Sequence, residues 1–173
     1  PLNIVSNIQG YYKNSYVYAG GIAGYMNGAS STPIIIRRSY NRGDINFTLR
    51  TNHIYSSSNY NMSSVAYTGG IAGYSSAYNT ISDCYNRTAL TPVLYAQSSY
   101  SSAYATSTAY VGGILGYMAS TTSFTFANCY NTAYIPATCT TSGNATSNYY
   151  SDALFYGGST FAAWRARPGC RPG

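Results

Sequence analysis

One eight-residue phrase occurs three times in this chain, as Tyr18-Ala-Gly-Gly-Ile-Ala-Gly-Tyr25, Tyr67-Thr-Gly-Gly-Ile-Ala-Gly-Tyr74 and Tyr110-Val-Gly-Gly-Ile-Leu-Gly-Tyr117. The three copies differ only at their second and sixth positions. Self-similarity over tens of residues is typical of proteins built from stacked structural units. The sequence therefore predicts a repeat protein rather than a single irregular domain.

A second phrase follows each copy of the first. It occurs as Ile36-Arg-Arg-Ser-Tyr-Asn41, Ile81-Ser-Asp-Cys-Tyr-Asn86 and Phe126-Ala-Asn-Cys-Tyr-Asn131, at a fixed step of 45 residues. An apolar residue closes each phrase at the same offset, as Ile45, Leu90 and Ile135. If the repeats stack in register, Asn41, Asn86 and Asn131 lie above one another and can form an amide ladder. Three independent surface turns are the alternative.

The glycine phrase has the pattern of a β-strand. Alternate residues between Tyr16 and Tyr25 are apolar on both faces, which is typical of a strand covered on both sides. Its clustered glycines predict either a close approach by a neighbouring backbone or bulky side chain, or a bend at a bulge. We expect the flanking tyrosines to supply the bulky partner. The polar inserts 26–33, 75–80 and 118–123 are predicted loops.

These patterns predict an all-β fold, a repeat-built parallel β-solenoid (β-helix-like) with atypical N- and C-terminal caps. No stretch has a convincing helical period. The expected core of the repeats is a set of six residues: Ile22, Ile71, Ile114, Tyr40, Tyr85 and Tyr130. We expect residues 1–15 to form a cap strand, residues 16–148 the three repeats, and residues 149–173 an aromatic and basic tail that caps the array or reaches a neighbouring subunit.

The length of the repeat raises the question of how many coils it forms. The connections 46–66 and 91–109 are rich in hydroxyl side chains, and the second carries regularly spaced tyrosines, so it is predicted to contain strands. Because 45 residues is long for one turn of a solenoid, two coils per repeat is the preferred interpretation.

The composition restricts how the surface is solvated. Charged residues make up 7% of the 173 residues, against about a quarter in an average globular chain. The chain contains 22 tyrosines and 17 glycines. Such a surface has to be solvated by hydroxyl and amide groups, covered by glycan, or buried against copies of the same chain.

The net charge of +6 does not indicate a nucleic-acid binder. The chain has only three acidic residues, so the positive sign arises mostly from missing acids, and no dense basic face is predicted. No apolar run is long enough to span a bilayer. The chain starts at Pro1 without a Met or a signal-like segment, which suggests a processed product or a fragment.

The pairing of Gly-Gly-Ile-x-Gly-Tyr with a downstream Cys-Tyr-Asn resembles the GLUG-type repeat of secreted and surface-attached proteins, including non-catalytic regions of bacterial adhesins and immunoglobulin-cleaving peptidases. The resemblance covers three phrase pairs between Tyr18 and Ile135. It implies an extracellular, right-handed solenoid-like array that serves as a stalk or adhesive surface. The repeat is longer here, and the glycine after Tyr-Asn is present only as Gly43, with Thr88 and Ala133 in the other copies.

Four cysteines are candidates for disulfides: Cys84, Cys129, Cys139 and Cys170. Cys84 and Cys129 occupy equivalent repeat positions. One coil per repeat would place them about 4.8 Å apart, within disulfide reach, whereas two coils would place them about 9.6 Å apart. On the two-coil interpretation, Cys129 with Cys139 or Cys139 with Cys170 are the expected pairs.

Four Asn-x-Ser/Thr sequons are candidate N-glycosylation sites, at Asn46, Asn61, Asn86 and Asn144. Asn46, Asn61 and Asn144 lie in polar connections, where a glycan is accessible. Asn86 is also a predicted ladder position, and an inward asparagine cannot carry a glycan. Asn46, Asn61 and Asn144 are therefore the preferred sites.

The chain offers little chemistry for catalysis or metal binding. A glycosidase needs two carboxylates and a triad needs a base beside its nucleophile, but one histidine and three scattered aspartates form no obvious set. A lone His53 without a Cys-x-x-Cys makes a zinc site improbable. We expect no enzyme activity, no cofactor and no metal.

The predicted function is structural. We expect a non-catalytic subunit or segment of an extracellular filament or surface appendage that is glycosylated and assembles with copies of itself head to tail, because a solenoid leaves unpaired strand edges at both ends. The alternative is a cell-surface adhesin module that binds glycans through exposed tyrosines.

Overall fold

The computed structural model describes residues 2–8, 14–53, 61–98, 104–120, 123–133, 135, 138–142, 145–152 and 155–157. This part of the chain is all-β and contains no helix. Its strands form five sheets, numbered here in chain order, and all pairings between strands of a sheet are parallel. The predicted fold class, a parallel β-solenoid, is confirmed.

Three sheets contain four strands each. Sheet 1 consists of β1 (Leu2–Ile8), β6 (Ile45–His53), β11 (Leu90–Ser98) and β16 (Thr138–Ser142). Sheet 2 consists of β2 (Asn14–Gly20), β7 (Asn61–Gly69), β12 (Tyr104–Gly112) and β17 (Ala145–Asp152). Sheet 3 consists of β3 (Ala23–Met26), β8 (Ala72–Ser75), β13 (Leu115–Met118) and β18 (Phe155–Gly157).

Two smaller sheets contain three strands each. Sheet 4 consists of β4 (Ile34–Arg37), β9 (Asn79–Ser82) and β14 (Thr125–Ala127). Sheet 5 consists of β5 (Tyr40–Asn41), β10 (Tyr85–Asn86) and β15 (Tyr130–Asn131).

Each repeat makes one coil of the solenoid, not two. The chain passes through sheets 2, 3, 4, 5 and 1 in turn and re-enters sheet 2 one layer further along the axis. Tyr40 pairs with Tyr85 and Tyr85 with Tyr130, so one 45-residue step equals one layer. The two-coil interpretation is wrong because the polar connections are themselves long strands. Each of β6, β7, β11 and β12 contains nine residues, which accounts for the length of the repeat.

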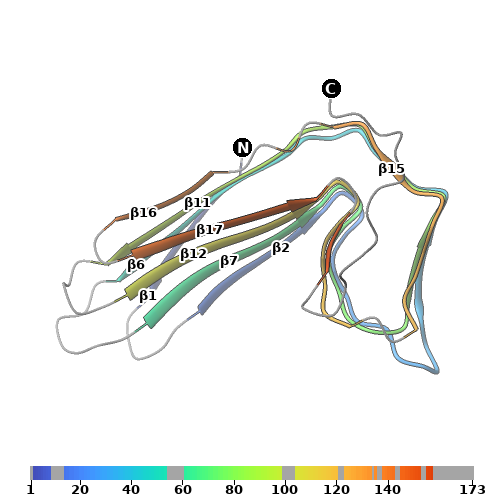
Figure 1. The fold of residues 1–173 in the computed structure, drawn as a ribbon, viewed down its shortest axis with the longest axis horizontal. Helices are drawn as coiled ribbons and strands as arrows, with labels where there is room; N and C mark the ends of the chain where they lie inside the picture. Colours follow the sequence, from blue (N-terminus) through green and yellow to red (C-terminus); the bar gives the residue numbers. More distant parts are fainter. Residues whose placement is uncertain are drawn as a thin grey trace.

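Every coil has two parts with separate cores (Figure 1). Sheets 1 and 2 face each other as a two-layer arm, and their inner residues Phe47, Leu49, Ala66, Leu90 and Leu94 form one buried cluster. Sheets 3, 4 and 5 close a loop around a second cluster that includes Met26, Ile71, Ile81, Ile114 and Leu115. The three coils are β2–β6, β7–β11 and β12–β16, called the first, second and third coil below.

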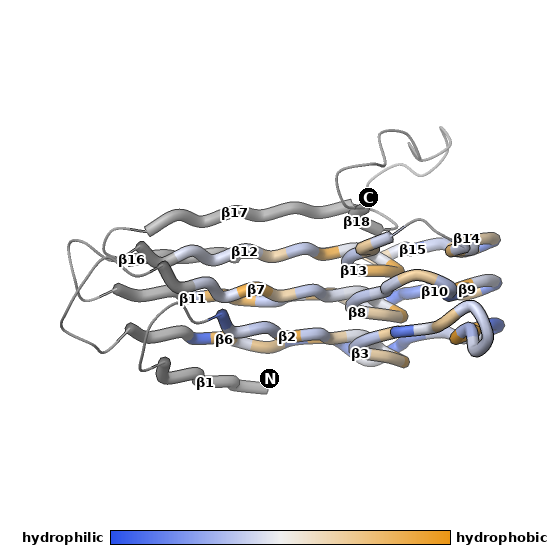
Figure 2. The backbone as a smooth tube through the Cα atoms, turned by 90° about the horizontal axis from the view of Figure 1, so that it is seen from below, coloured by the Kyte–Doolittle hydropathy of each residue, from blue (hydrophilic) through white to orange (hydrophobic). Residues whose placement is uncertain are grey.

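The ends of the array continue the same sheets (Figure 2). β1 adds a strand to sheet 1 beside β6, and β17 and β18 begin a fourth coil on β12 and β13. In β17, Ala145–Asp152 keep the register of β12, so the repeated architecture extends beyond residue 148, where the sequence predicted the tail to begin. Residues 158–173 of the predicted tail lie outside the described part of the chain.

The glycine phrase forms a sharp corner between sheets 2 and 3. In the first coil β2 ends at Gly20 and β3 begins at Ala23, and the other copies break at the same place. A Cβ atom added at Gly116 would lie 2.5 Å from both the Gly73 carbonyl oxygen and the Thr68 nitrogen. The predicted close approach and bend are therefore both present. The approaching atoms at Gly116 are backbone atoms of the neighbouring coil, not tyrosine rings.

Candidate functional site

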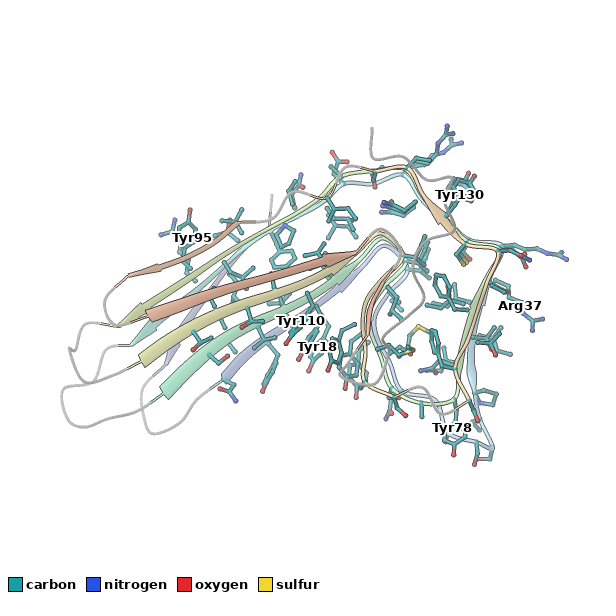
Figure 3. The ribbon with its side chains drawn as sticks, viewed as in Figure 1. Tyr18, Arg37, Tyr78, Tyr95, Tyr110 and Tyr130 are labelled. Atoms are coloured by element: carbon teal, nitrogen blue, oxygen red, sulfur yellow. The ribbon has the colours of Figure 1, made fainter. Side chains whose placement is uncertain are left out.

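Two columns of stacked tyrosines lie in the angle that this corner makes between sheets 2 and 3 (Figure 3). In the column from sheet 2, ring centroids are 5.4 Å apart for Tyr18 and Tyr67 and 5.2 Å for Tyr67 and Tyr110, with nearly parallel planes. In the column from sheet 3, Tyr74 lies 4.9 Å from Tyr25 and 5.7 Å from Tyr117. We call these two sets together the corner tyrosines.

The two columns also pack against each other. Tyr18 and Tyr25 meet edge to face, with centroids 5.2 Å apart and planes at 83°, and Tyr67 and Tyr74 repeat the contact at 5.2 Å and 75°. Offset-stacked and edge-to-face pairs are the favoured aromatic geometries, each contributing about 0.5–1.5 kcal/mol beyond burial. The corner tyrosines therefore hold sheet 2 to sheet 3 and each coil to the next.

Burial changes the acidity of three corner tyrosines. The pKa values of Tyr18, Tyr67 and Tyr74 are raised above that of a free tyrosine, first because desolvation disfavours the phenolate and second because neighbouring tyrosines would add like charge. These hydroxyls are therefore neutral throughout the neutral pH range and remain hydrogen-bond donors.

A third tyrosine column lies on the outer surface of sheet 5. Tyr85 stacks between Tyr40 and Tyr130, with centroids 5.2 Å away on both sides. The sequence placed these three residues in the repeat core, and the structure corrects this: Tyr40 and Tyr130 are about half exposed. The reason is local, because neighbours in a short strand alternate sides, and in each Tyr-Asn pair the asparagine is the one that points inward.

The predicted asparagine ladder is present inside sheet 5. Asn41 Nδ2 donates to Asn86 Oδ1 at 3.1 Å, and Asn86 Nδ2 donates to Asn131 Oδ1 at 2.8 Å. Each side chain also closes its own turn, since Asn41 Oδ1 accepts from the Gly43 N–H at 3.0 Å and Asn131 Oδ1 from the Ala133 N–H at 3.2 Å. Asn86 is fully buried, and Asn41 is nearly so.

The ladder lies directly against the glycine corner. A Cβ atom at Gly21 would lie 2.6 Å from Asn41 Cγ, and one at Gly70 would collide with the side chain of Asn86. The two repeated phrases therefore meet inside each of these coils: the glycines leave the space that the asparagine amides occupy. This contact is the physical reason that the phrases recur together.

Ile22, Ile71 and Ile114 form a column through the three coils, and their burial differs with their position in the array. Ile71 and Ile114 are fully buried, as expected for core residues, but Ile22 at the start of the array is 51% exposed. The Ile22 N–H donates to the Ile71 carbonyl at 3.0 Å, and the Ile71 N–H donates to the Ile114 carbonyl at 2.9 Å. Ile22 occupies the core column, but among the described residues no strand covers the side of Ile22 that faces away from the second coil.

Asn79 is a buried residue that sequence reasoning missed. Its Oδ1 accepts from the Gly28 N–H at 3.1 Å, and its Nδ2 lies 2.8 Å from Ser75 Oγ and 3.3 Å from the Met26 carbonyl. It thereby joins the first coil to the second where sheet 3 turns into sheet 4. No repeat signal marks it, because its register partner in the first coil is Ile34.

The four sequon asparagines have different surroundings. Asn46 is exposed on β6 and accepts a hydrogen bond from Thr91. Asn86 is fully buried in the ladder, so a glycan there would require the ladder to be dismantled. Asn61 begins β7, and its side chain lies outside the described part of the chain, as does the whole of Asn144.

Cys84 and Cys129 lie in adjacent coils as free thiols. The Cys84 carbonyl accepts from the Tyr130 N–H at 3.1 Å, and each thiol donates to the carbonyl two residues before it, at 3.1 and 3.2 Å. Burial raises the pKa of Cys129 to about 11. The pairings expected from two coils per repeat involve the Cys139 side chain and Cys170, which lie outside the described residues.

Charged groups are few, and those whose side chains the structure describes lie on the surface. Arg37, Arg38 and Arg42 are exposed on the first coil, and the Arg42 guanidinium lies 5.1 Å from the centre of the Tyr40 ring. Asp83 accepts from Asn128 Nδ2 at 3.0 Å, and it lines a polar depression together with Arg37, Arg38, Thr80, Ser82 and Thr125.

No set of three His, Cys, Asp or Glu side chains in the described segments is placed to hold a metal ion. In the same segments, no helix has the length and apolar character to cross a bilayer.

The main features of the described structure are therefore tyrosine columns, an amide ladder and open strand edges. No protein-family model matches the chain, and no curated protein or solved structure matches it either.

Proposed function

We propose that this chain is a non-catalytic structural subunit or segment of an extracellular filament or surface appendage, which assembles with copies of itself through the ends of its solenoid. The observation that carries the proposal is the distribution of exposed large apolar and tyrosine side chains. Among the described residues, six of the seven belong to the first coil: Tyr16, Tyr18, Ile22, Tyr25, Ile35 and Tyr40.

The same positions are better covered one layer further on. Ile71 is fully buried below the third coil, and Val65, the register partner of Tyr16, is 9% exposed. Exposed apolar patches of this kind commonly mark interaction sites. An added layer would cover the first coil in the way the second coil is covered, which supports association through that end.

The side-chain inventory supports a structural role. Asp44, Asp83 and Asp152 are the acidic residues of the chain, and His53 is its one histidine. The polar depression over sheet 4 brings one carboxylate together with two guanidinium groups and three hydroxyl side chains, and its lining contains no histidine or cysteine.

Glycans belong to the proposal at accessible sequons. Asn46 is exposed on the arm and is the first site that we propose, with Asn61 and Asn144 as further candidates. A glycan would solvate a surface that has few charged groups. The proposal leaves out Asn86 because its amide is consumed by the ladder.

The adhesin alternative is less well supported by the tyrosine geometry. Sugars stack on the open face of an aromatic ring, but Tyr67 and Tyr85 have a stacked ring on both faces. Such columns present edges and hydroxyls to solvent. The GLUG-type resemblance, including an extracellular location, is compatible with either function and remains part of the proposal.

Electron microscopy of the purified chain tests the proposal. We expect fibres of uniform width whose amount rises with protein concentration, and light scattering should show a mass increasing in whole subunits. Particles that stay monomeric at every concentration and bind a glycan array would favour the adhesin instead. Intact mass before and after deglycosylation tests the glycans separately.

A further inference from the structure

The two ends of the solenoid present the same three sheets. Sheets 1, 2 and 3 begin with β1, β2 and β3 and end with β16, β17 and β18, whereas sheets 4 and 5 have one strand fewer (Figure 2). We call the first set the starting rim and the second set the finishing rim. In the described part of the chain, neither rim has a further strand on its outer edge.

The rims match in strand length as well as in order. On the starting rim β1, β2 and β3 contain seven, seven and four residues, and on the finishing rim β16, β17 and β18 contain five, eight and three. Unpaired edges of this length are templates for another chain. Because all strands run parallel, a starting rim can continue the ladders of a finishing rim only if both copies point the same way.

The register of sheet 2 shows how such a joint would be aligned. Tyr18, Tyr67, Tyr110 and Tyr150 are successive partners in β2, β7, β12 and β17. A second copy whose β2 pairs with β17 in the same register places its Tyr18 next in that column. The Ile22 side chain, half exposed at the starting rim, would then be covered.

Charge favours this orientation over the reverse one. Arg37, Arg38 and Arg42 surround the turn of the first coil, and the residues one and two coils further at the Arg37 position are Ser82 and Ala127. Two starting rims facing each other would bring three cations from each copy together, and like-charge contacts across an interface are costly. The third coil presents no such cluster in its described turn, where Asn128 and Thr132 occupy the equivalent positions.

We propose that the partner of the starting rim is the finishing rim of a second copy of this chain, paired parallel and in the register that places Tyr18 on Tyr150. The inference rests on the proposed function and specifies its joint. The joint is heterologous, and because it adds strand layers along the axis of the solenoid, it repeats without closing into a ring and produces a polar filament. Sheets 1, 2 and 3 run continuously through it, and among the described residues no strand fills the layer between β14 and β15 of one copy and β4 and β5 of the next.

Paired cysteines test the register. Asn14 and Thr146 occupy the same column of sheet 2, through Ser63 and Thr106. In the proposed joint, residue 14 of one copy lies one strand, about 4.8 Å, from residue 146 of the next, which is within disulfide reach. We therefore expect the double variant N14C/T146C to form covalent dimers, trimers and longer multimers on mild oxidation.

The matched control is N14C/S147C, because residue 147 is one position out of register and on the opposite face of β17. Both variants carry serine in place of Cys129, Cys139 and Cys170, while Cys84 is fully buried and is retained. Circular dichroism checks that both fold. The in-register pair should yield at least about tenfold more covalent multimer than the control.

The outcomes separate the joint from the function. Fibres that form without preferential linkage at 14 and 146 overturn the proposed joint but leave the filament intact. Equal linkage of the two variants also overturns it, because the register then has no effect. If neither the wild type nor the variants assemble at any concentration, the filament and the joint are both wrong.

Discussion

At the scale of single residues, the asparagine ladder is the contact that most directly depends on one side-chain type. Asn86 accepts from Asn41 on one side and donates to Asn131 on the other, and its Nδ2 also lies 3.1 Å from the Thr88 carbonyl. Only a group that both donates and accepts can occupy the middle of this column, which explains why an amide recurs there.

Replacing Asn86 by Asp should therefore destabilise the fold by about 3 kcal/mol at neutral pH, because the carboxylate lacks the amide donor and is buried away from water. The loss should become smaller in acid, where the protonated carboxyl can donate again. Thermal unfolding at pH 7 and pH 4 measures both effects. N46D is the control, since Asn46 is exposed; equal effects of the two substitutions would show that the ladder contributes little.

Sequence reasoning identified this ladder because a fixed step of 45 residues between identical turns is enough to place them in one column. The same reasoning could not decide which residue of each Tyr-Asn pair points inward. Alternation assigns neighbours to opposite faces but does not say which face is the core, and apolar character suggested the tyrosine. The buried asparagine prevails because its amide hydrogen bonds are satisfied within the column.

At the scale of the elements, the glycine phrase is a corner and not one strand. The sequence predicted the close approach but assigned it to tyrosine rings, because tyrosine flanks every copy. The space beside Gly21 and Gly70 is instead filled by Asn41 and Asn86, which lie 20 and 16 residues later in the chain. A contact at that separation depends on where the coil closes, and the local pattern does not contain that information.

The corner tyrosines should make the fold sensitive to alkali. The pKa values of Tyr18, Tyr67 and Tyr74 are raised in the folded state, while the pKa of a tyrosine in the unfolded chain is about 10. Their contribution to stability is therefore complete below pH of about 10 and is lost as the pH rises toward the folded-state values. We expect the urea midpoint of unfolding to fall progressively above that pH.

Tyr67 gives the matched variant for this experiment, since it stacks on both sides and its pKa is raised by burial and by four neighbouring tyrosines. Y67F keeps the ring and removes the titrating group, so the alkaline fall in the urea midpoint should become shallower. The absorbance of tyrosinate during the titration provides a second measurement. A wild-type midpoint that is unchanged through this alkaline range would contradict the role assigned to these hydroxyls.

At the scale of the whole molecule, the number of coils per repeat was the property that the sequence predicted wrongly. A 45-residue step exceeds a compact solenoid turn, which suggested two coils. The additional length forms the two-layer arm of sheets 1 and 2, with its own apolar core around Phe47 and Leu94. That core is not visible as a repeat phrase, because the arm residues differ between copies: Phe47 pairs with Pro92, and Thr48 with Val93.

The open first coil gives the last prediction. Ile22 and Ile35 are equally exposed, at 51%, but Ile22 lies between β2 and β3 on the starting rim, whereas Ile35 lies on β4 beside the layer that the proposed joint leaves open. I22K would bury an unpaired ammonium group in the joint, which is strongly unfavourable, so the concentration needed for assembly should rise at least about tenfold. I35K introduces the same charge outside the joint and should assemble as the wild type does. Sedimentation of dilution series measures the three proteins side by side, with circular dichroism as the check on folding. If I35K blocks assembly as strongly as I22K does, added charge acts through general repulsion, and the starting rim has no special part in the contact.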